Sequence, residues 1–196
     1  MKRIPVVKLT EQVAFQKHFD RSSIDALMEQ IDDTTVYIID DAGIKKNHPQ
    51  VNIYQQLATR YELWVDAGPR HTGDMIDIVF TGVKRVIIRP WIWKEVGFGK
   101  VRSMTDHQLL QLSEASVVDR QSIERSVSVM DEFDGIIVYI IGDWKKRRFK
   151  NEEMLKALAQ RDEAYVYEPA GLHESTWDNY GFTGMLYDGF KNEVME

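Results

Sequence analysis

The sequence contains no cysteine, which excludes disulfide bonds, a thiolate zinc site and a cysteine nucleophile. It has no run of about 18 apolar residues, the length that a membrane-spanning helix needs. Its first residues, Met-Lys-Arg-Ile-Pro-Val-Val-Lys-Leu, lack the apolar core of a signal peptide. Acidic residues outnumber basic ones by 31 to 25, so the strong basic footprint of nucleic-acid-binding proteins is missing. These absences predict a cytoplasmic protein that binds neither nucleic acid nor a membrane.

Common cofactor and catalytic motifs are also absent. The chain has no P-loop, no complete G-x-G-x-x-G and no G-x-S-x-G elbow. Its scattered histidines, among them His48, His71, His107 and His173, do not have the spacing of a metal-ligand set. The sequence therefore predicts no cofactor and no resident metal.

What the chain does contain is an alternation of strand-like and helix-like segments over its 196 residues, which predicts a single domain. Short β-branched and aromatic runs recur, each followed by a helical pattern, as in Met154–Leu158 or after Ser22, Thr72, Thr105 and Ser175. Several runs are apolar on both faces, which is typical of parallel strands covered by helices. The eight runs are Ile4–Leu9, Val36–Asp40, Leu63–Asp66, Val86–Arg89, Ser116–Asp119, Ile136–Ile141, Ala164–Glu168 and Met185–Asp188.

An internal repeat favours a closed barrel over an open sheet. Val36-Tyr-Ile-Ile-Asp-Asp41 matches Val138-Tyr-Ile-Ile-Gly-Asp143, and Phe80-Thr-Gly82 matches Phe182-Thr-Gly184, each at an offset of 102. Leu57–Val65 matches Leu158–Val166 at an offset of 101. A repeat of about a hundred residues that contains four strands predicts two half-barrels, about 1–113 and 114–196. Together they form one compact α/β, (β/α)8 barrel.

These motifs resemble the histidine-biosynthesis barrels of the HisA/HisF family, the ribotide isomerase and the cyclase subunit of imidazole glycerol phosphate synthase. The resemblance rests on the repeat and on two segments, Val36-Tyr-Ile-Ile-Asp-Asp-Ala-Gly43 and Leu63-Trp-Val-Asp-Ala-Gly-Pro-Arg70, and it spans essentially the whole chain. It implies a barrel of two halves, phosphorylated ligands, and catalytic acids at the ends of strands 1 and 5.

Several family positions are altered in this chain. Asp119 matches the strand-5 acid, whereas the strand-1 acid falls on Lys8. The strand-6 hydroxyl falls within Ile140–Asp143, which has no serine or threonine, and Arg89-Pro90 replaces the expected Gly-Thr after strand 4. The phosphate turns after strands 7 and 8 fall on Glu168–Gly171 and Asp188-Gly189, where carboxylates repel a phosphate. The family's own isomerase reaction is therefore not predicted.

Active sites of α/β barrels lie at the carboxyl ends of the strands. Here every predicted strand ends in or beside an ionisable residue, which indicates a polar site closed from below by an apolar core. The alternative is a set of solvated loop starts and caps, some in weak surface ion pairs. In chain order the residues are Lys8, Asp40, Asp66, Arg89, Asp119, Asp143, Glu168 and Asp188.

Lys8, Asp119, Asp40 and Asp66 form the predicted catalytic set. A partly desolvated lysine loses its proton more readily. It can then serve in proton transfer or form a Schiff base with a carbonyl substrate. We expect Lys8 and Asp119 at equivalent positions of the two halves, and a purely structural lysine–aspartate pair is the alternative.

Arg70 and Arg89, with Gly68, form the predicted anion site. Their planar guanidinium groups suit a phosphate or a carboxylate, and a helix beginning near Thr72 adds backbone donors. Asp143, Glu168 and Asp188 form a secondary polar cluster, which suits a hard cation or a cationic part of a substrate. No EF-hand-type loop supports a metal there. Trp91 and Trp93 follow strand 4 either as a lid or as rim packing.

Only eight residues follow the last predicted strand, so the final helix is expected to be short or missing. Apolar surface left on the outside of strands 8 and 1 predicts a homodimer or partner contact on this flank. The predicted function is that of an isomerase- or lyase-type enzyme for a small anionic, phosphorylated metabolite. The alternative is a catalytically silent family member that serves as a binding or assembly protein.

Overall fold

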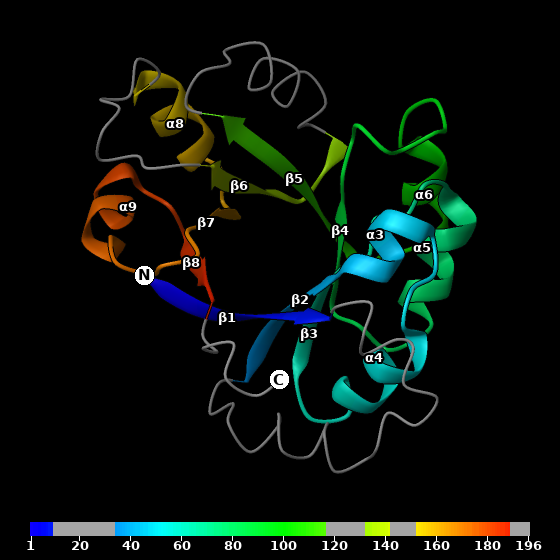
Figure 1. Cartoon of the computed structure of the whole chain (residues 1–196). Coiled ribbons are helices and arrows are strands. Elements are labelled where there is room, and N and C mark those ends of the chain that lie inside the picture. The colour runs from blue at the N-terminus through cyan, green and yellow to red at the C-terminus, as the bar shows by residue number, and fades with distance from the viewer. Residues whose placement is uncertain (10–33, 117–131, 142–151, 189–196) are drawn as a thin grey trace. The chain divides into compact units, whose positions relative to one another are not determined.

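The computed structural model describes residues 1–9, 34–116, 132–141 and 152–188. Its strands form a closed parallel barrel in the order β1 to β8, and helices alternate with them, which confirms the predicted (β/α)8 class (Figure 1). The strands are β1 Lys2–Leu9, β2 Thr35–Asp40, β3 Glu62–Asp66, β4 Arg85–Ile88, β5 Gln108–Ser116, β6 Gly135–Ile141, β7 Ala164–Tyr167 and β8 Gly184–Tyr187. The described helices are α3 Asp41–Lys46, α4 Val51–Leu57, α5 Thr72–Val79, α6 Gly99–Met104, α8 Glu152–Ala159 and α9 Glu174–Tyr180.

The fifth strand is the clear error of the sequence-based prediction. The structure places β5 at Gln108–Ser116, so Ser116 ends the strand that was predicted to begin there, and the helix expected after Thr105 does not exist. The segment Gln-Leu-Leu-Gln-Leu-Ser-Glu-Ala is rich in good helix formers. Its strand state comes from pairing with β6 along its length, a tertiary contact that overrides propensity. The predicted half-barrel boundary at 113/114 therefore falls inside β5.

The chain divides into two compact units. The first unit is Pro5–His107 with Gly189–Glu196, and the second unit is Gln108–Asp188 with Met1–Ile4. The stretch after β8, where the final helix is expected to be short or missing, and the helical pattern predicted after Ser22 lie outside the described residues. Within the described residues, no helix is long and apolar enough to cross a membrane.

In the first unit, strands pair in parallel and in register. Lys8 pairs with Ile39, and Ile39 pairs with Asp66, so these residues lie at one level of the sheet and on one face. Tyr37 pairs with Trp64, and Trp64 with Arg85, one level below. Asp40, on the other face of β2, contacts Tyr54 of α4 and so faces the helices. The face that carries Lys8 and Asp66 is thus the one opposite the helices, which in a closed barrel is the interior.

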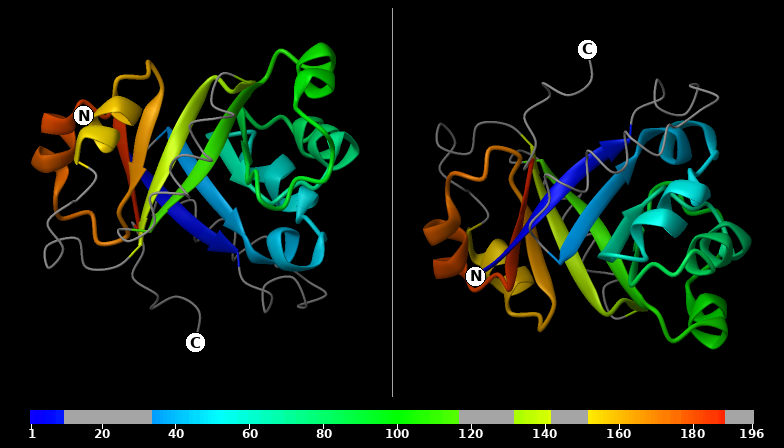
Figure 2. Two further views of the ribbon diagram at one scale, coloured as in Figure 1. Left: turned by 90° about the horizontal axis from the view of Figure 1, so that it is seen from above. Right: turned by 90° about the horizontal axis from the view of Figure 1, so that it is seen from below.

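The second unit has its apolar core between strands and helices. Val138 of β6 and Val166 of β7 belong to one buried cluster with Leu155 of α8 and Trp177 of α9. Two views in Figure 2 show both helices on the same side of β6–β8. Side chains alternate along a strand, so Tyr139 and Tyr167 lie on the opposite face, the interior one.

The outer face of β1 is buried toward the carboxyl end of the strand, whereas Arg3 on the same face is exposed. Val7 and Leu9, which alternate with the interior position Lys8, are 6% and 3% exposed. The homodimer through the β8/β1 flank stays a prediction.

Candidate functional site

The first unit carries an ion pair on the interior face at the ends of β3 and β4. Asp66 is the last residue of β3, and Arg89 follows β4 directly. The Arg89 Nε donates to both carboxylate oxygens of Asp66, at 2.9 and 3.1 Å, and Nη2 donates to Oδ2 at 2.7 Å. The Tyr37 hydroxyl donates to Oδ2 at 3.2 Å. The structure thus brings together two of the residues singled out from sequence and adds Tyr37.

This pair is largely removed from water, because Asp66 is fully buried and the Arg89 side chain is 15% exposed. A guanidinium stays charged under all ordinary conditions, and its planar fork matches a carboxylate. The Trp91 ring lies over Arg89, with 5.7 Å between the guanidinium carbon and the ring centroid. The arrangement holds a buried carboxylate and a guanidinium together through three hydrogen bonds.

Lys8 belongs to the same face as this pair. Its register partner Ile39 lies between Lys8 and Asp66 in the sheet, and the Lys8 side chain is exposed. Two strand spacings separate the two backbones, which corresponds to roughly 10 Å. An amine of long reach therefore stands two strands from a fixed carboxylate, a geometry that suits proton transfer or addition to a carbonyl.

Asp40 points the other way, toward the helices. Its carboxylate caps α3 by accepting from the backbone N–H groups of Ala42 and Gly43, at 3.0 and 3.1 Å. It also accepts from the backbone N–H of Gln50 at 2.8 Å and from the Tyr54 hydroxyl. Burial and the Asp40 charge raise the pKa of the Tyr54 hydroxyl above its usual range. Asp40 is fully buried, and its contacts are those of a helix cap.

Arg70 and Gly68 pack the loop after β3. The Arg70 guanidinium donates to Asn47 Oδ1 at 2.6 Å and to the carbonyls of Ile44 and Gly43 at 3.0 and 3.4 Å, at the end of α3. Gly68 has φ +62°, and a Cβ there would lie 2.8 Å from Ile92 Cδ1. Arg70 and Arg89 therefore bind separate protein acceptors. The contacts of Arg70 are those of a side chain that caps the carboxyl end of α3. A role of either arginine in anion binding stays a prediction.

In the second unit, Glu168 faces the helix layer. Its carboxylate accepts from the His173 backbone N–H and from the Trp177 indole N–H, both at 3.1 Å, and from the His173 ring Nδ1. Glu168 is 6% exposed. These donors come from the middle of α9 and from the residue before it, so Glu168 ties β7 to that helix.

Asp188 lies on the interior side of the same unit. It accepts from the Tyr167 hydroxyl at 2.6 Å, and the Tyr167 ring stacks on Tyr139 with centroids 4.8 Å apart. Burial, followed by the hydrogen bond to Asp188, raises the pKa of Tyr167 above its usual range. Sequence reasoning missed both tyrosines, although alternation from the buried Val166 identifies Tyr167 as an interior position.

Asp119 and Asp143 lie outside the described residues. Because β5 ends at Ser116, Asp119 follows that strand by three positions. The acid inside β5 is Glu114, which the register pairs with the interior position Tyr139. In the described part of the chain, no group of three or more histidines and acids is placed to hold a metal ion.

No family profile and no curated protein matches the sequence. Solved structures do match the fold. A dihydropteroate synthase from Coxiella burnetii in complex with pteroic acid is similar at TM-score 0.62 with 8% identity, over 95% of this chain and 87% of that one. A Yersinia pestis DHPS with a pterine-sulfa conjugate has TM-score 0.56 and 11% identity, over 95% and 86%. A dihydrodipicolinate synthase from Agrobacterium tumefaciens has TM-score 0.60 and 12% identity, over 95% and 68%. These likenesses show the barrel fold.

Proposed function

We propose that this chain is a divergent barrel enzyme of the HisA/HisF type, an isomerase or lyase that acts on a small anionic, phosphorylated metabolite. One observation carries the proposal: Lys8, Asp66 and Arg89 share the interior face at the carboxyl ends of β1, β3 and β4. This is the end of the barrel where (β/α)8 enzymes place their chemistry. That solved barrels of similar fold include synthases is compatible with an enzyme.

Each residue has a distinct part in the proposed reaction. Lys8 transfers a proton or, as a neutral amine, adds to a substrate carbonyl and forms an imine with loss of water. Arg89 binds the anionic group through its guanidinium, and Asp66 holds Arg89 in orientation. Asp119 remains the proposed second proton-transfer group. Arg70 joins the anion site if its guanidinium leaves the carbonyls at the end of α3.

The Schiff-base form of the proposal is tested by borohydride trapping. The protein is incubated with pentose phosphates and cyanoborohydride, which reduces an imine to a stable secondary amine. Peptide mass spectrometry should then find the added mass on Lys8. The matched control is Lys2→Met, since Lys2 is an exposed lysine at the opposite end of the same strand. Equal labelling in Lys8→Met, or no preference for Lys8 over surface lysines, would refute this role.

The anion site is tested by titrating inorganic phosphate and pentose phosphates in thermal-shift and calorimetric assays. We expect stabilisation of the parent protein and at least tenfold weaker binding by Arg89→Lys, because an ammonium cannot bind Asp66 in a forked pair and also present a planar set of further donors to an anion. Lys keeps a positive charge next to Asp66, which limits damage to the fold. Unchanged affinity in Arg89→Lys would remove Arg89 from the site.

A specific observation favours the second candidate, a catalytically silent binding or assembly protein. Both guanidinium groups of the predicted anion site bind acceptors of the protein itself, Asp66 for Arg89 and the end of α3 for Arg70. If no phosphate compound stabilises the protein and no trapping occurs at Lys8, this candidate is preferred. Light scattering then decides whether the chain assembles with itself.

A further inference from the structure

The loop after β4 contacts the loop after β3 and the start of α5, and the Glu95 carboxylate takes part in these contacts. We infer that Glu95 is a positioning residue that latches residues 90–98, here called the strap, to the start of α5. Through this latch it holds Trp91 and Arg89 in place at the end of β4. The consequence for ligand binding rests on the proposed function, whereas the latch itself does not.

Contacts of three kinds join the strap to residues 67–72, the loop after β3 and the first residue of α5. Ile92 packs so closely on Gly68 that a Cβ on this glycine would lie 2.8 Å from Ile92 Cδ1. The Lys94 backbone N–H donates to the Arg70 carbonyl at 2.7 Å. The Thr72 hydroxyl donates to a carboxylate oxygen of Glu95. Apolar packing, a backbone bond and a charged side-chain bond thus act on three nearly consecutive strap residues.

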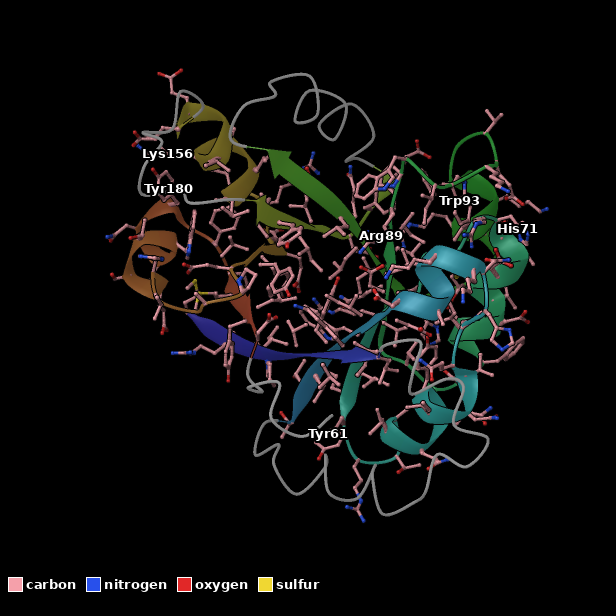
Figure 3. All side chains as sticks on the ribbon, in the orientation of Figure 1. Tyr61, His71, Arg89, Trp93, Lys156 and Tyr180 are labelled. Carbon is pink, nitrogen blue, oxygen red and sulfur yellow. The ribbon has the colours of Figure 1, made fainter. Side chains whose placement is uncertain are left out.

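The strap is also ordered within itself. Its first turn is closed on Arg89, whose carbonyl accepts from the N–H groups of Ile92 and Trp93 at 3.0 and 3.3 Å. At its other end the Trp93 ring packs on Phe98 with centroids 5.0 Å apart, and the indole N–H donates to the Gly97 carbonyl at 3.3 Å. Figure 3 shows Trp93 at the same end of the unit as His71, beside α5 and α6. Movement of the strap is therefore transmitted to the turn at Arg89.

Glu95 is the charged residue among these contacts, and its neighbours favour the ionised form of its carboxylate. The hydroxyl of Thr72, 3% exposed, is its main partner, and the positive charge of Lys100 and any on His71 act in the same direction. The Thr72 hydrogen bond, first among these causes, lowers the pKa of Glu95 below its ordinary value. Glu95 is therefore ionised at neutral pH, and the latch weakens only as the pH falls through this lowered pKa.

The latch acts on the ion pair through Trp91. This ring is 50% exposed, yet it lies over the Arg89 guanidinium that grips Asp66. A half-exposed indole keeps such a place only if its backbone is fixed, and the strap contacts fix it on the side away from Arg89. Loss of the latch should loosen Trp91 first and the orientation of Arg89 second.

The test uses the full chain labelled with 5-fluorotryptophan and needs no ligand. Trp91→Phe and Trp93→Phe assign the two strap signals in fluorine NMR spectra. In Glu95→Gln the Trp91 signal should shift or broaden, while the Trp177 signal of the second unit stays in place. Exchange of the Lys94 amide, measured by hydrogen exchange, should be roughly tenfold faster or more, because a charged hydrogen bond has been weakened.

Two comparisons separate a latch from a general loss of stability. Thr72→Ser keeps the hydroxyl and should behave as the parent protein, whereas Thr72→Val should reproduce Glu95→Gln. Lowering the pH from 7 through the lowered pKa of Glu95 should move the Trp91 signal more in the parent than in Glu95→Gln. The control Glu62→Gln changes an exposed acid at the other end of β3 and should leave both signals unchanged.

If the Trp91 signal and the Lys94 exchange rate are the same in Glu95→Gln as in the parent, Glu95 is not a positioning residue. This result would leave the trapping at Lys8 and the phosphate titrations unaffected. Conversely, a protein that binds no phosphate compound can still show the latch. If the latch and the proposed anion site both exist, Glu95→Gln should change the phosphate affinity by at least threefold. Trapping at Lys8 should be unchanged in this variant.

Discussion

The junction after β3 and the junction after β7 begin with the same pattern, an acid at the end of a strand, and use it in opposite ways. In the first unit Asp66 is the last residue of β3, faces the interior and binds Arg89 and Tyr37. In the second unit Glu168 follows β7, faces the helices and binds His173 and Trp177. One acid belongs to a candidate site, and the other fastens a helix.

A shift of one residue explains this difference. The strand repeat has an offset of 101, which aligns Asp66 with Tyr167 and places Glu168 opposite Ala67. Since side chains alternate along a strand, moving an acid by one position moves it to the other face of the sheet. The interior position of β7 is then held by Tyr167, which donates to Asp188. Charge at a strand end is thus informative only together with the face that the strand gives it.

The largest expected effect comes from breaking the ion pair between Asp66 and Arg89. Arg89→Ala leaves the fully buried Asp66 carboxylate without its guanidinium, which should lower the free energy of unfolding by about 3–5 kcal/mol. His173→Ala should cost less, about 1–3 kcal/mol, because the indole of Trp177 still donates to Glu168. Urea denaturation monitored by circular dichroism gives both values.

A double variant keeps this comparison decisive even if Arg89→Ala does not fold. Asp66→Asn in the Arg89→Ala background removes the unpaired charge and should recover part of the stability. Equal losses for Arg89→Ala and His173→Ala, with no recovery in the double variant, would contradict the distinction between the two junctions.

The fold was predictable because its buried strands are short apolar runs that recur along the sequence. Runs such as Tyr-Ile-Ile at 37–39 and Ile-Ile-Val-Tyr-Ile-Ile at 136–141 are apolar on both faces, and the repeat places them in equivalent parts of two halves. Boundaries of seven strands agree within two residues with the prediction. The fifth strand was missed because its leucines and glutamines carry no β-branched signal, and pairing with β6 decides its state.

The candidate site was only partly predictable, because the sequence does not show which face of the sheet a strand-end side chain occupies or which residues it binds. Lys8, Asp66 and Arg89 were singled out because they lie at strand ends, where barrel enzymes place their chemistry, and the structure puts them on one face; their roles stay predictions. Strand ends alone do not say which face a residue occupies, so Asp40 and Glu168 were grouped with them although both bind helix starts. Arg70 illustrates the second limit, because its acceptors at the end of α3 are distant in sequence. The contacts of Tyr37 and Glu95 likewise form only in the folded chain.

Two glycines in the loops after β3 and β7 give the prediction of intermediate size. Gly68 and Gly171 both have φ +62°, a conformation that costs an alanine about 1–2 kcal/mol. A Cβ on Gly68 would also lie 2.9 Å from the Ile44 Cα, whereas one on Gly171 would lie 3.0 Å from the Tyr187 Cβ and otherwise meet flexible atoms. Gly68→Ala should therefore cost about 2–4 kcal/mol and Gly171→Ala about 1–2 kcal/mol in urea denaturation. An equal cost would mean that the strap does not press on Gly68.

The smallest effect concerns two tyrosines that donate to carboxylates on opposite faces, Tyr54 to Asp40 on the helix side and Tyr167 to Asp188 on the interior side. Burial is the first cause that raises the pKa of each hydroxyl above its usual range. Each therefore stays protonated in the folded chain, while the unfolded chain ionises near pH 10. The contribution of each raised pKa to the free energy of unfolding is fully present below about pH 9 and is lost as the pH rises beyond about 10.

For a tyrosine that stays protonated, the loss between pH 9 and pH 10.5 amounts to about 0.8 kcal/mol. Tyr54→Phe should remove a loss of this size from the alkaline part of the stability curve, and Tyr167→Phe should remove an equal or smaller one. Urea denaturation of the parent and both variants at pH 8, 9, 10 and 10.5 measures the slopes. Parallel curves for all three proteins would show that neither hydroxyl keeps its proton. A reduced slope in only one variant would show which face of the sheet excludes water better at its carboxyl end.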